Sequence, residues 1–151
     1  MARKQIAKVA TIPVGTNLNL SMDGDAWVLS IDLTQDHGVS AAGKSRKVAT
    51  SGGNVSVAAG LKLGVNVYDP ILGRKLTLKD IPDQGTFSIG ANIMARIERG
   101  VLFLSIDAGQ DLGPTASEKS RLVASTGGNT TIAAGLKLGV NLYDPIPSPR
   151  A

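Results

Sequence analysis

The most constraining feature of this chain is a nine-residue string, AAGLKLGVN, which occurs twice without a change, at residues 58–66 and 133–141. With a constant offset of 75 residues, the segment 29–71 matches 104–146 at 29 of 43 positions. The chain is therefore a tandem duplication, and its fold must be assembled from two similar halves. We expect a pseudo-twofold axis between the halves, with an interface of the kind that joins identical subunits.

Hydrophobic alternation in the repeat is typical of β-strands. In the stretch 61–68, every second residue from Leu61 to Val67 is aliphatic. The residues between them are Lys62, Gly64, Asn66 and Tyr68. A period of two indicates a strand with one buried face, and no segment of the repeat shows a sustained helical period. We predict an all-β protein of two tandem, homologous lobes, each with about five short strands in a small barrel or sandwich.

Turn residues divide the first repeat into its elements. The predicted elements are a first strand over 12–22, a tight turn at Asp23-Gly24, a second strand over 26–33, a loop over 34–43 and a short third strand over 48–50. A Gly-Gly-Asn run at 52–54, repeated at 127–129, predicts a turn or a bulge after the third strand.

The repeat boundaries define the expected domain organisation. The parts are a basic arm at 1–10, a first β repeat at 11–71, a connector at 72–85, a second β repeat at 86–146 and a proline-rich tail at 147–151. A unit of about 75 residues buries little surface by itself. The two repeats are therefore expected to share a core or to associate further.

The charge balance of the chain permits an anionic partner. The formal net charge is +4 and the sequence pI is about 9.6, values found in nucleic-acid-binding proteins and also in proteins that bind no anion. The chain has no cysteine, which excludes disulfides and thiolate zinc sites. No run approaches about 18 apolar residues. We expect no membrane partner, and either a cytoplasmic protein or a component of a particle assembled inside a cell.

One motif points to a nucleotide but lacks its context. Residues 38–45 fit the phosphate-binding pattern G-x-x-x-x-G-K-[ST]. Such a loop cradles phosphates where a strand enters it and a helix leaves it, whereas the exit at 46–50 is β-prone. In the second repeat, Glu118 replaces Gly43 and would place a carboxylate next to a phosphate. We therefore predict no bound nucleotide.

The chain shows no residue set that is typical of an enzyme. Its single histidine, His37, is replaced by Leu112 in the second repeat, so a symmetric histidine site is excluded. Four carboxylates kept in both repeats could bind a metal or act as acid and base, but their turn context favours capping of backbone amides. They are Asp32, Asp36, Asp107 and Asp111. We predict no enzymatic activity, no cofactor and no metal site.

The polar face of the last strand is the best candidate for a binding surface. It offers cations, amides and aromatic rings in one row, and single-stranded nucleic acid needs charge for its phosphates and π-faces for its bases. Basic residues at the loop ends would add charge to its edge. The candidate residues are Lys44, Arg46, Lys62, Asn66 and Tyr68 in the first repeat, and Lys119, Arg121, Lys137, Asn141 and Tyr143 in the second. Such rows also occur on ordinary solvated or interface faces, and that alternative stays open.

A longer motif carries a family resemblance. It begins Lys-Ser-x-x-Val-Ala-[Ser/Thr], continues to Gly-Asn and is followed by Leu-Gly-Val-Asn-x-Tyr, spanning 44–68 and 119–143. It resembles small, single-copy, mostly uncharacterised β-rich proteins of archaea and phages, over about a third of each repeat. The resemblance implies a compact, strand-rich unit able to self-associate, and it implies no activity and no site residue.

Two functions fit these observations. The first is a non-enzymatic nucleic-acid-binding module, most favoured for single-stranded DNA or RNA, that uses the basic loop ends and the Lys/Asn/Tyr strand faces. The alternative is a structural or assembly protein, such as a phage virion component of the capsid, decoration or tail. In that alternative the basic arm and the proline-rich tail contact neighbours in a homo-oligomer or larger assembly. Exposed polar strand faces serve both functions.

Overall fold

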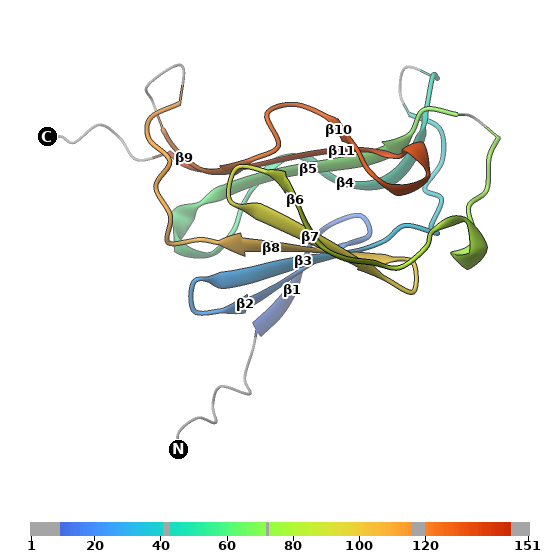
Figure 1. The fold of residues 1–151 in the computed structure, drawn as a ribbon. Coiled ribbons are helices and arrows are strands. Elements are labelled where there is room, and N and C mark those ends of the chain that lie inside the picture. The colour runs from blue at the N-terminus through green and yellow to red at the C-terminus, as the bar shows by residue number, and fades with distance from the viewer. Residues whose placement is uncertain (1–9, 41–42, 72, 116–119, 146–151) are drawn as a thin grey trace, which may run out of the picture.

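The structure is a computed structural model that describes residues 10–40, 43–71, 73–115 and 120–145, which form two antiparallel β-sheets stacked face to face (Figure 1). The all-β prediction is confirmed. Because the strand order of both sheets is open, the architecture is a sandwich and not a barrel. Lys119, the proline-rich tail and all of the basic arm except Ala10 lie outside the described residues.

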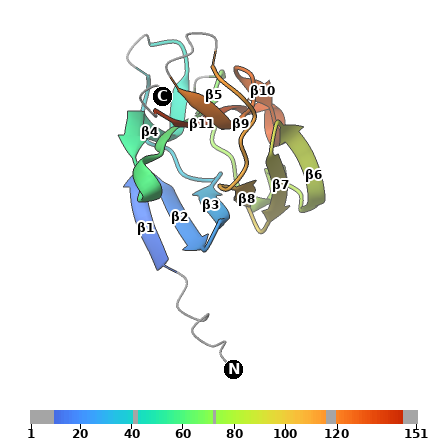
Figure 2. The ribbon, with the colours of Figure 1, turned by 90° about the vertical axis from the view of Figure 1, so that its left-hand side faces the viewer.

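Sheet A contains three strands from each repeat. Its order is β1 (Ala10–Gly15), β2 (Leu18–Asp23), β3 (Ala26–Asp32), β8 (Val101–Asp107), β7 (Ile93–Glu98) and β6 (Gln84–Gly90). Figure 2 shows these strands in a row beneath the second sheet. Each repeat forms an antiparallel meander, and the two meanders meet at the centre of the sheet, where β3 pairs with β8.

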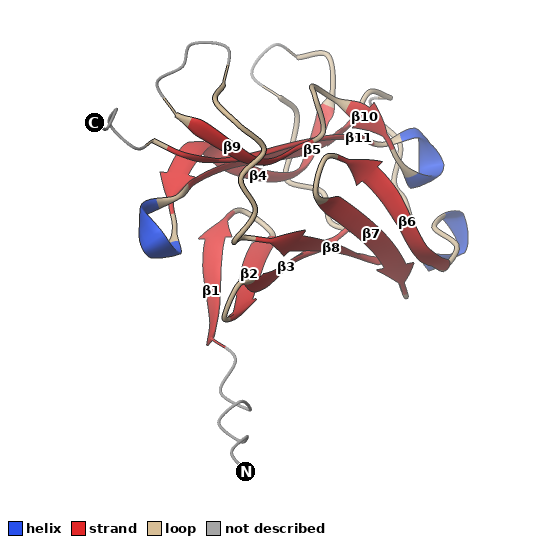
Figure 3. Ribbon diagram, turned by 60° about the vertical axis from the view of Figure 1, so that its left-hand side comes forward, coloured by secondary structure: helices blue, strands red, loops and turns tan. Residues whose placement is uncertain are grey.

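Sheet B joins the two repeats in the same way. Its strands are β4 (Arg46–Ser56), β5 (Lys62–Asp69) and β11 (Lys137–Asp144), and β11 pairs in addition with β9 (Arg121–Ser125) and β10 (Thr130–Thr131). The short 3-10 helices are η2 (Ala58–Gly60), η3 (Leu78–Asp80) and η4 (Ala133–Gly135), and they lie at the ends of the sandwich (Figure 3). The repeats meet at the centre, where β5 pairs with β11.

The strand registers locate a pseudo-twofold axis. In sheet A, Leu29 lies opposite Leu104, and in sheet B, Val65 lies opposite Val140. Both pairs join residues that are 75 positions apart, so each residue faces its own copy, as residues on the axis of a symmetric dimer do. The axis therefore passes through the centre of both sheets, and each sheet continues from one lobe into the other.

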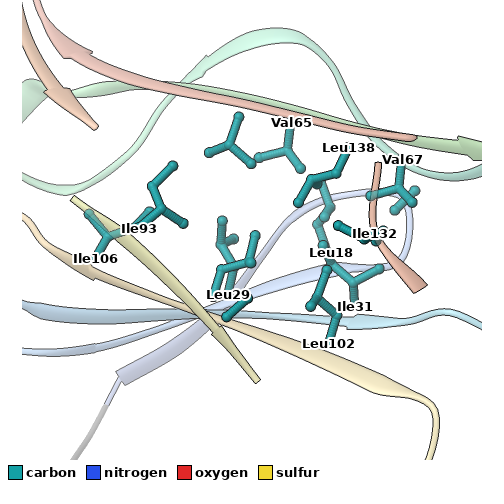
Figure 4. Close-up of a cluster of buried hydrophobic side chains, with 14 of the residues drawn as sticks. Leu18, Leu29, Ile31, Val65, Val67, Ile93, Leu102, Ile106, Ile132 and Leu138 are labelled. Carbon is teal, nitrogen blue, oxygen red and sulfur yellow. The ribbon is translucent and has the colours of Figure 1, made fainter. Parts of the chain in front are cut away.

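The inward faces of the two sheets form one aliphatic core. Figure 4 shows Leu29, Ile31 and Leu102 of sheet A on the side that faces Val65 and Leu138 of sheet B. All five side chains are buried. Burial of an aliphatic side chain of this size stabilises a fold by about 1.5–3 kcal/mol. Because both repeats contribute to this core, the expectation of a shared core is met.

The prediction of one strand over residues 12–22 is wrong, because this segment is the hairpin of β1 and β2. The chain turns at Asn17, which has a φ of 59°. Its Nδ2 donates to the carbonyl oxygens of Asp32 at 2.8 Å and Val48 at 2.9 Å, so the turn is bonded to both sheets. Asn92 repeats this geometry. Asparagine adopts the left-handed region more readily than most residues, and strand alternation does not reveal it.

The predicted interruption of the third strand takes a different form in each repeat. In the first repeat, β4 continues through the Gly-Gly-Asn run, and its pairing with β5 shifts register between Thr50 and Asn54. In the second repeat, the run separates β9 from β10. The run is therefore a bulge in one copy and a break in the other. The turn predicted at Asp23-Gly24 joins β2 to β3, with Gly24 at a φ of 63°.

Candidate functional site

The pairing of β5 with β11 places the polar rows of the two repeats side by side. Lys62 lies opposite Tyr143, and Tyr68 lies opposite Lys137, so each end of the combined surface has one lysine and one tyrosine. We call this surface the axial polar face. It consists of Lys62, Gly64, Asn66 and Tyr68 on β5 and Lys137, Gly139, Asn141 and Tyr143 on β11. At about 3.3 Å per residue, it extends for about 20 Å along each strand.

A shallow depression of about 190 Å³ lies on the pseudo-twofold axis at the centre of the axial polar face. Its lining consists of asparagines and glycines only: Gly53, Asn54, Gly64 and Asn66, with their copies Gly128, Asn129, Gly139 and Asn141. The glycines are needed for space. A Cβ on Gly64 would lie 2.4 Å from Asn54 Oδ1, and a Cβ on Gly139 would lie 2.5 Å from Asn129 Oδ1.

The tyrosine rings are held by hydrogen bonds that cross between the repeats. Asn54 Nδ2 donates to Tyr143 Oη at 2.9 Å, and Asn129 Nδ2 donates to Tyr68 Oη at 3.0 Å. These bonds fix each ring at its end of the face before any ligand arrives, which lowers the entropic cost of stacking on it. The sequence indicated Asn54 and Asn129 only as turn residues. Their identity in both repeats was the available signal for a further role.

The two asparagines of the central strands present amide NH2 groups to the depression. Asn66 Oδ1 accepts from Thr50 Oγ1 at 2.7 Å, and Asn141 Oδ1 accepts from Ser125 Oγ at 2.8 Å. Both hydroxyls belong to the outer strands, so each amide oxygen points away from the axis. Within the described residues, neither Asn66 Nδ2 nor Asn141 Nδ2 has a hydrogen-bond partner. The face therefore has two unpaired donors near its centre.

The lysines at the ends of the face keep their charge available. Lys62 Nζ donates to Ser56 Oγ, and Lys137 Nζ donates to Thr131 Oγ1, both at 2.5 Å. In the part of the chain that the structure describes, neither ammonium group forms a salt bridge. A hydroxyl orients a lysine without neutralising it. Each end of the face therefore offers a positioned positive charge to an anion.

The basic loop ends differ from their prediction. Lys44 is exposed, but Arg46 is only 5% exposed because its guanidinium is bonded to Asp69 at 3.0 Å. The prediction of Arg46 as a surface cation is therefore wrong, since its charge is used inside the fold. Arg121 is exposed and paired with Asp111. Lys119 lies outside the described residues.

Asp69 is the acceptor at the centre of this buried cluster. Its carboxylate is fully buried and also accepts from Arg74, with Nε and Nη2 both at 2.9 Å. Burial by itself raises the pKa of Asp69, but the hydrogen bonds from Arg74, the backbone of Ile71 and Arg46 outweigh it. The pKa is therefore held below its usual value, and the carboxylate is charged when folded.

Lys47 is a candidate that sequence reasoning missed. It is exposed on β4 and lies opposite Tyr68 in the strand register. Together with Tyr68 and Asn129 it lines a second depression of about 270 Å³. Leu122 occupies the equivalent position in the second repeat. Lys47 was therefore not predicted, because the predicted site contained only residues that both repeats share. The Tyr68 end of the axial polar face is therefore the more basic end.

The carboxylates of the loops cap backbone turns, as predicted. Each accepts from a backbone amide two residues further along the chain. The pairs are Asp32 with Thr34, Asp36 with Gly38, Asp107 with Gly109, and Asp111 with Gly113, at 2.9–3.0 Å. Across the described ranges, no group of three or more His, Cys, Asp or Glu side chains could hold a metal. The segment after Lys44 is the strand β4, in agreement with its β-prone sequence.

Comparison with protein-family models, with curated proteins and with solved structures found no match to this chain. Among the described residues, no helix is long and apolar enough to cross a membrane. Function must therefore be inferred from the chemistry of the axial polar face and the residues around it.

Proposed function

We propose that this protein binds single-stranded nucleic acid on the axial polar face, without catalysing a reaction. The observation that carries the proposal is the convergence of the two repeats, which brings two lysines, two tyrosines and two asparagines onto one exposed surface. Lysines at both ends suit the phosphates of an extended strand, and tyrosine rings suit stacking with bases. A face of about 20 Å fits the shorter site sizes of sheet-based binders, about four nucleotides.

The charge distribution supports sheet B as the anion-binding side. The strands of sheet A carry four carboxylates and one arginine, whereas the strands of sheet B carry five cations and two carboxylates. One cation and one carboxylate of sheet B, Arg46 and Asp69, are buried as an ion pair and are not presented to solvent, which leaves four cations and one carboxylate on its strands. An anionic strand is therefore attracted to sheet B and repelled from sheet A.

The free edges of sheet A do not favour the alternative of a structural assembly protein. Strands at the edge of a sheet can pair with another copy, but proline and bulges oppose such pairing. The edge strand β1 contains Pro13, and the pairing of the other edge strand, β6, with β7 shifts register twice. We therefore place nucleic-acid binding ahead of assembly through sheet edges.

The proposal is tested by fluorescence anisotropy with a labelled oligonucleotide of about 20 nucleotides, between about 50 and 200 mM salt. We expect affinity to fall steeply as salt rises. The double substitution Lys62→Gln and Lys137→Gln removes two phosphate contacts and lowers the slope of log K against log salt by about 1.4. The matched control is Lys75→Gln with Lys79→Gln, which removes the same charge from exposed connector residues.

Two results would overturn the proposal. One is the absence of any binding at the lowest salt. The other is an equal loss of affinity in the two double variants, which would mean that net charge alone, and not the axial polar face, attracts the oligonucleotide.

A further inference from the structure

We infer that the central depression of the axial polar face prefers uracil or thymine, and that it takes these bases by their Watson–Crick edge. This inference rests on the proposed function and adds the base that the site selects. The free polar groups of the depression and their pseudo-twofold arrangement both point to such an edge.

Two amide NH2 groups, those of Asn66 and Asn141, have no hydrogen-bond partner among the described residues and lie at the central depression. Asn66 and Asn141 are diagonal neighbours across β5 and β11, because Asn66 faces Gly139 and Asn141 faces Gly64. Diagonal neighbours lie about 7–8 Å apart, and each NH2 group is directed inward because its amide oxygen bonds outward. The glycines leave the space between them open. The depression thus offers two inward donors with room for a planar group between them.

A thymine or uracil edge matches this arrangement. Its O2 and O4 oxygens both accept hydrogen bonds and lie on either side of the N3–H donor, so the edge has a local twofold symmetry. O2 and O4 can accept from Asn66 and Asn141, while N3–H faces the oxygens Asn54 Oδ1 and Asn129 Oδ1 that also line the depression. Adenine and cytosine each place an amino donor where one of the two acceptors is required.

The orientation of the two donors is fixed by hydroxyl groups. Thr50 Oγ1 accepts from the amide of Gly52 at 2.9 Å, and Ser125 Oγ accepts from the amide of Gly127 at 2.8 Å. Each hydroxyl hydrogen is then donated to the asparagine oxygen. Two different residues, threonine in one repeat and serine in the other, make the same pair of bonds. Thr50 and Ser125 are therefore positioning residues that keep the NH2 groups turned toward the axis.

The experiment compares labelled oligothymidylate with oligocytidylate of equal length by anisotropy at one salt concentration. Both are flexible pyrimidine strands of equal charge, so a difference reports the base edge. We expect oligothymidylate to bind about tenfold more tightly, within the range for a bidentate contact. In the double variant Thr50→Val with Ser125→Ala, the amides can rotate and the ratio should fall to about twofold or less. The exchange Thr50→Ser with Ser125→Thr keeps both hydroxyls and should restore the preference.

The possible outcomes separate this inference from the function on which it rests. If neither oligonucleotide binds, the proposed function fails. If both bind with equal affinity, the function stands and the base preference is overturned. If the preference for thymine survives unchanged in Thr50→Val with Ser125→Ala, the hydroxyl-set donors are not its source, and the inference is likewise overturned.

Discussion

The two repeats keep the same arginine and aspartate but use them in different ways. In the first repeat, Arg46 and Asp69 form a buried ion pair at 3.0 Å. In the second, Arg121 is exposed and pairs with Asp111, while Asp144 is half-buried. The strand pairing is alike, since Arg46 faces Asp69 just as Arg121 faces Asp144. Identical side chains at equivalent positions therefore acquire different roles from what covers them.

The cover in the first repeat is the connector. Arg74 donates to Asp69 and also to the carbonyl oxygen of Ala134 at 2.6 Å, so it ties the end of β5 to the second repeat. Leu76 and Ile81 of the same segment are buried. The position equivalent to Arg74 is Pro149, which has no charge to offer. The connector thus fixes this end of the first repeat, whereas the second repeat has no arginine at the equivalent position of its sequence.

The largest expected effect is on the stability of the fixed end. Asp69→Asn leaves the buried Arg46 with only the longer contact to Asp36, at 3.8 Å, as its ion pair. Removal of one partner of a buried pair costs about 3–5 kcal/mol of unfolding free energy. Asp144→Asn removes a carboxylate that solvent reaches and should cost less than about 1 kcal/mol. Urea unfolding followed by circular dichroism measures both. Equal losses would show that the buried cluster has no special role.

A smaller effect concerns the pH dependence of the same cluster. The pKa of Asp69 is lowered in the folded state, so its stabilisation is present above the unfolded value of about 3.9 and is lost as pH falls through the folded pKa. The difference in unfolding free energy between the wild type and Asp69→Asn should therefore narrow below about pH 4. The pKa of Asp80 is also lowered, chiefly by the hydrogen bond from the Thr77 amide. The contribution of Asp80 cancels in this difference, because both proteins contain that residue. A difference that is constant from pH 7 to below about pH 3 contradicts this prediction.

Two sequence patterns, the alternation of period two and the internal repeat, predicted the strands and the symmetry of the fold. Alternation at 61–68 predicted the strand β5, and the offset of 75 residues predicted the pseudo-twofold axis. The turn at Asn17 was not predicted, because its left-handed backbone is stabilised by carbonyl oxygens of two strands that are distant in sequence. The pairing of β5 with β11 was not predicted either. Internal similarity indicates a pseudo-twofold axis, but it does not indicate which strands lie on that axis.

The candidate site was predicted in its components but not in its chemistry. Lys62, Asn66 and Tyr68 lie with their copies on the axial polar face that the structure brings together. The burial of Arg46 depends on Asp69, 23 residues away, and on Arg74 of the connector, which strand periodicity does not link. The asparagines that hold the tyrosine rings belong to a run that reads locally as a turn. The burial of Arg46 and the positions of the tyrosine rings both depend on contacts between residues that are far apart in the sequence.

The smallest expected effect tests the unequal ends of the axial polar face. Lys47 flanks Tyr68, whereas Leu122 flanks Tyr143, so one more phosphate contact is available at the Tyr68 end. Lys47→Leu should lower the salt slope of single-strand binding by about 0.7, and Leu122→Lys should raise it by the same amount. The exchange Lys47→Leu with Leu122→Lys keeps the net charge and should leave the slope near that of the wild type. If Lys47→Leu weakens binding while Leu122→Lys has no effect, the strand contacts only the Tyr68 end, and the two repeats then differ in binding as they do in stability.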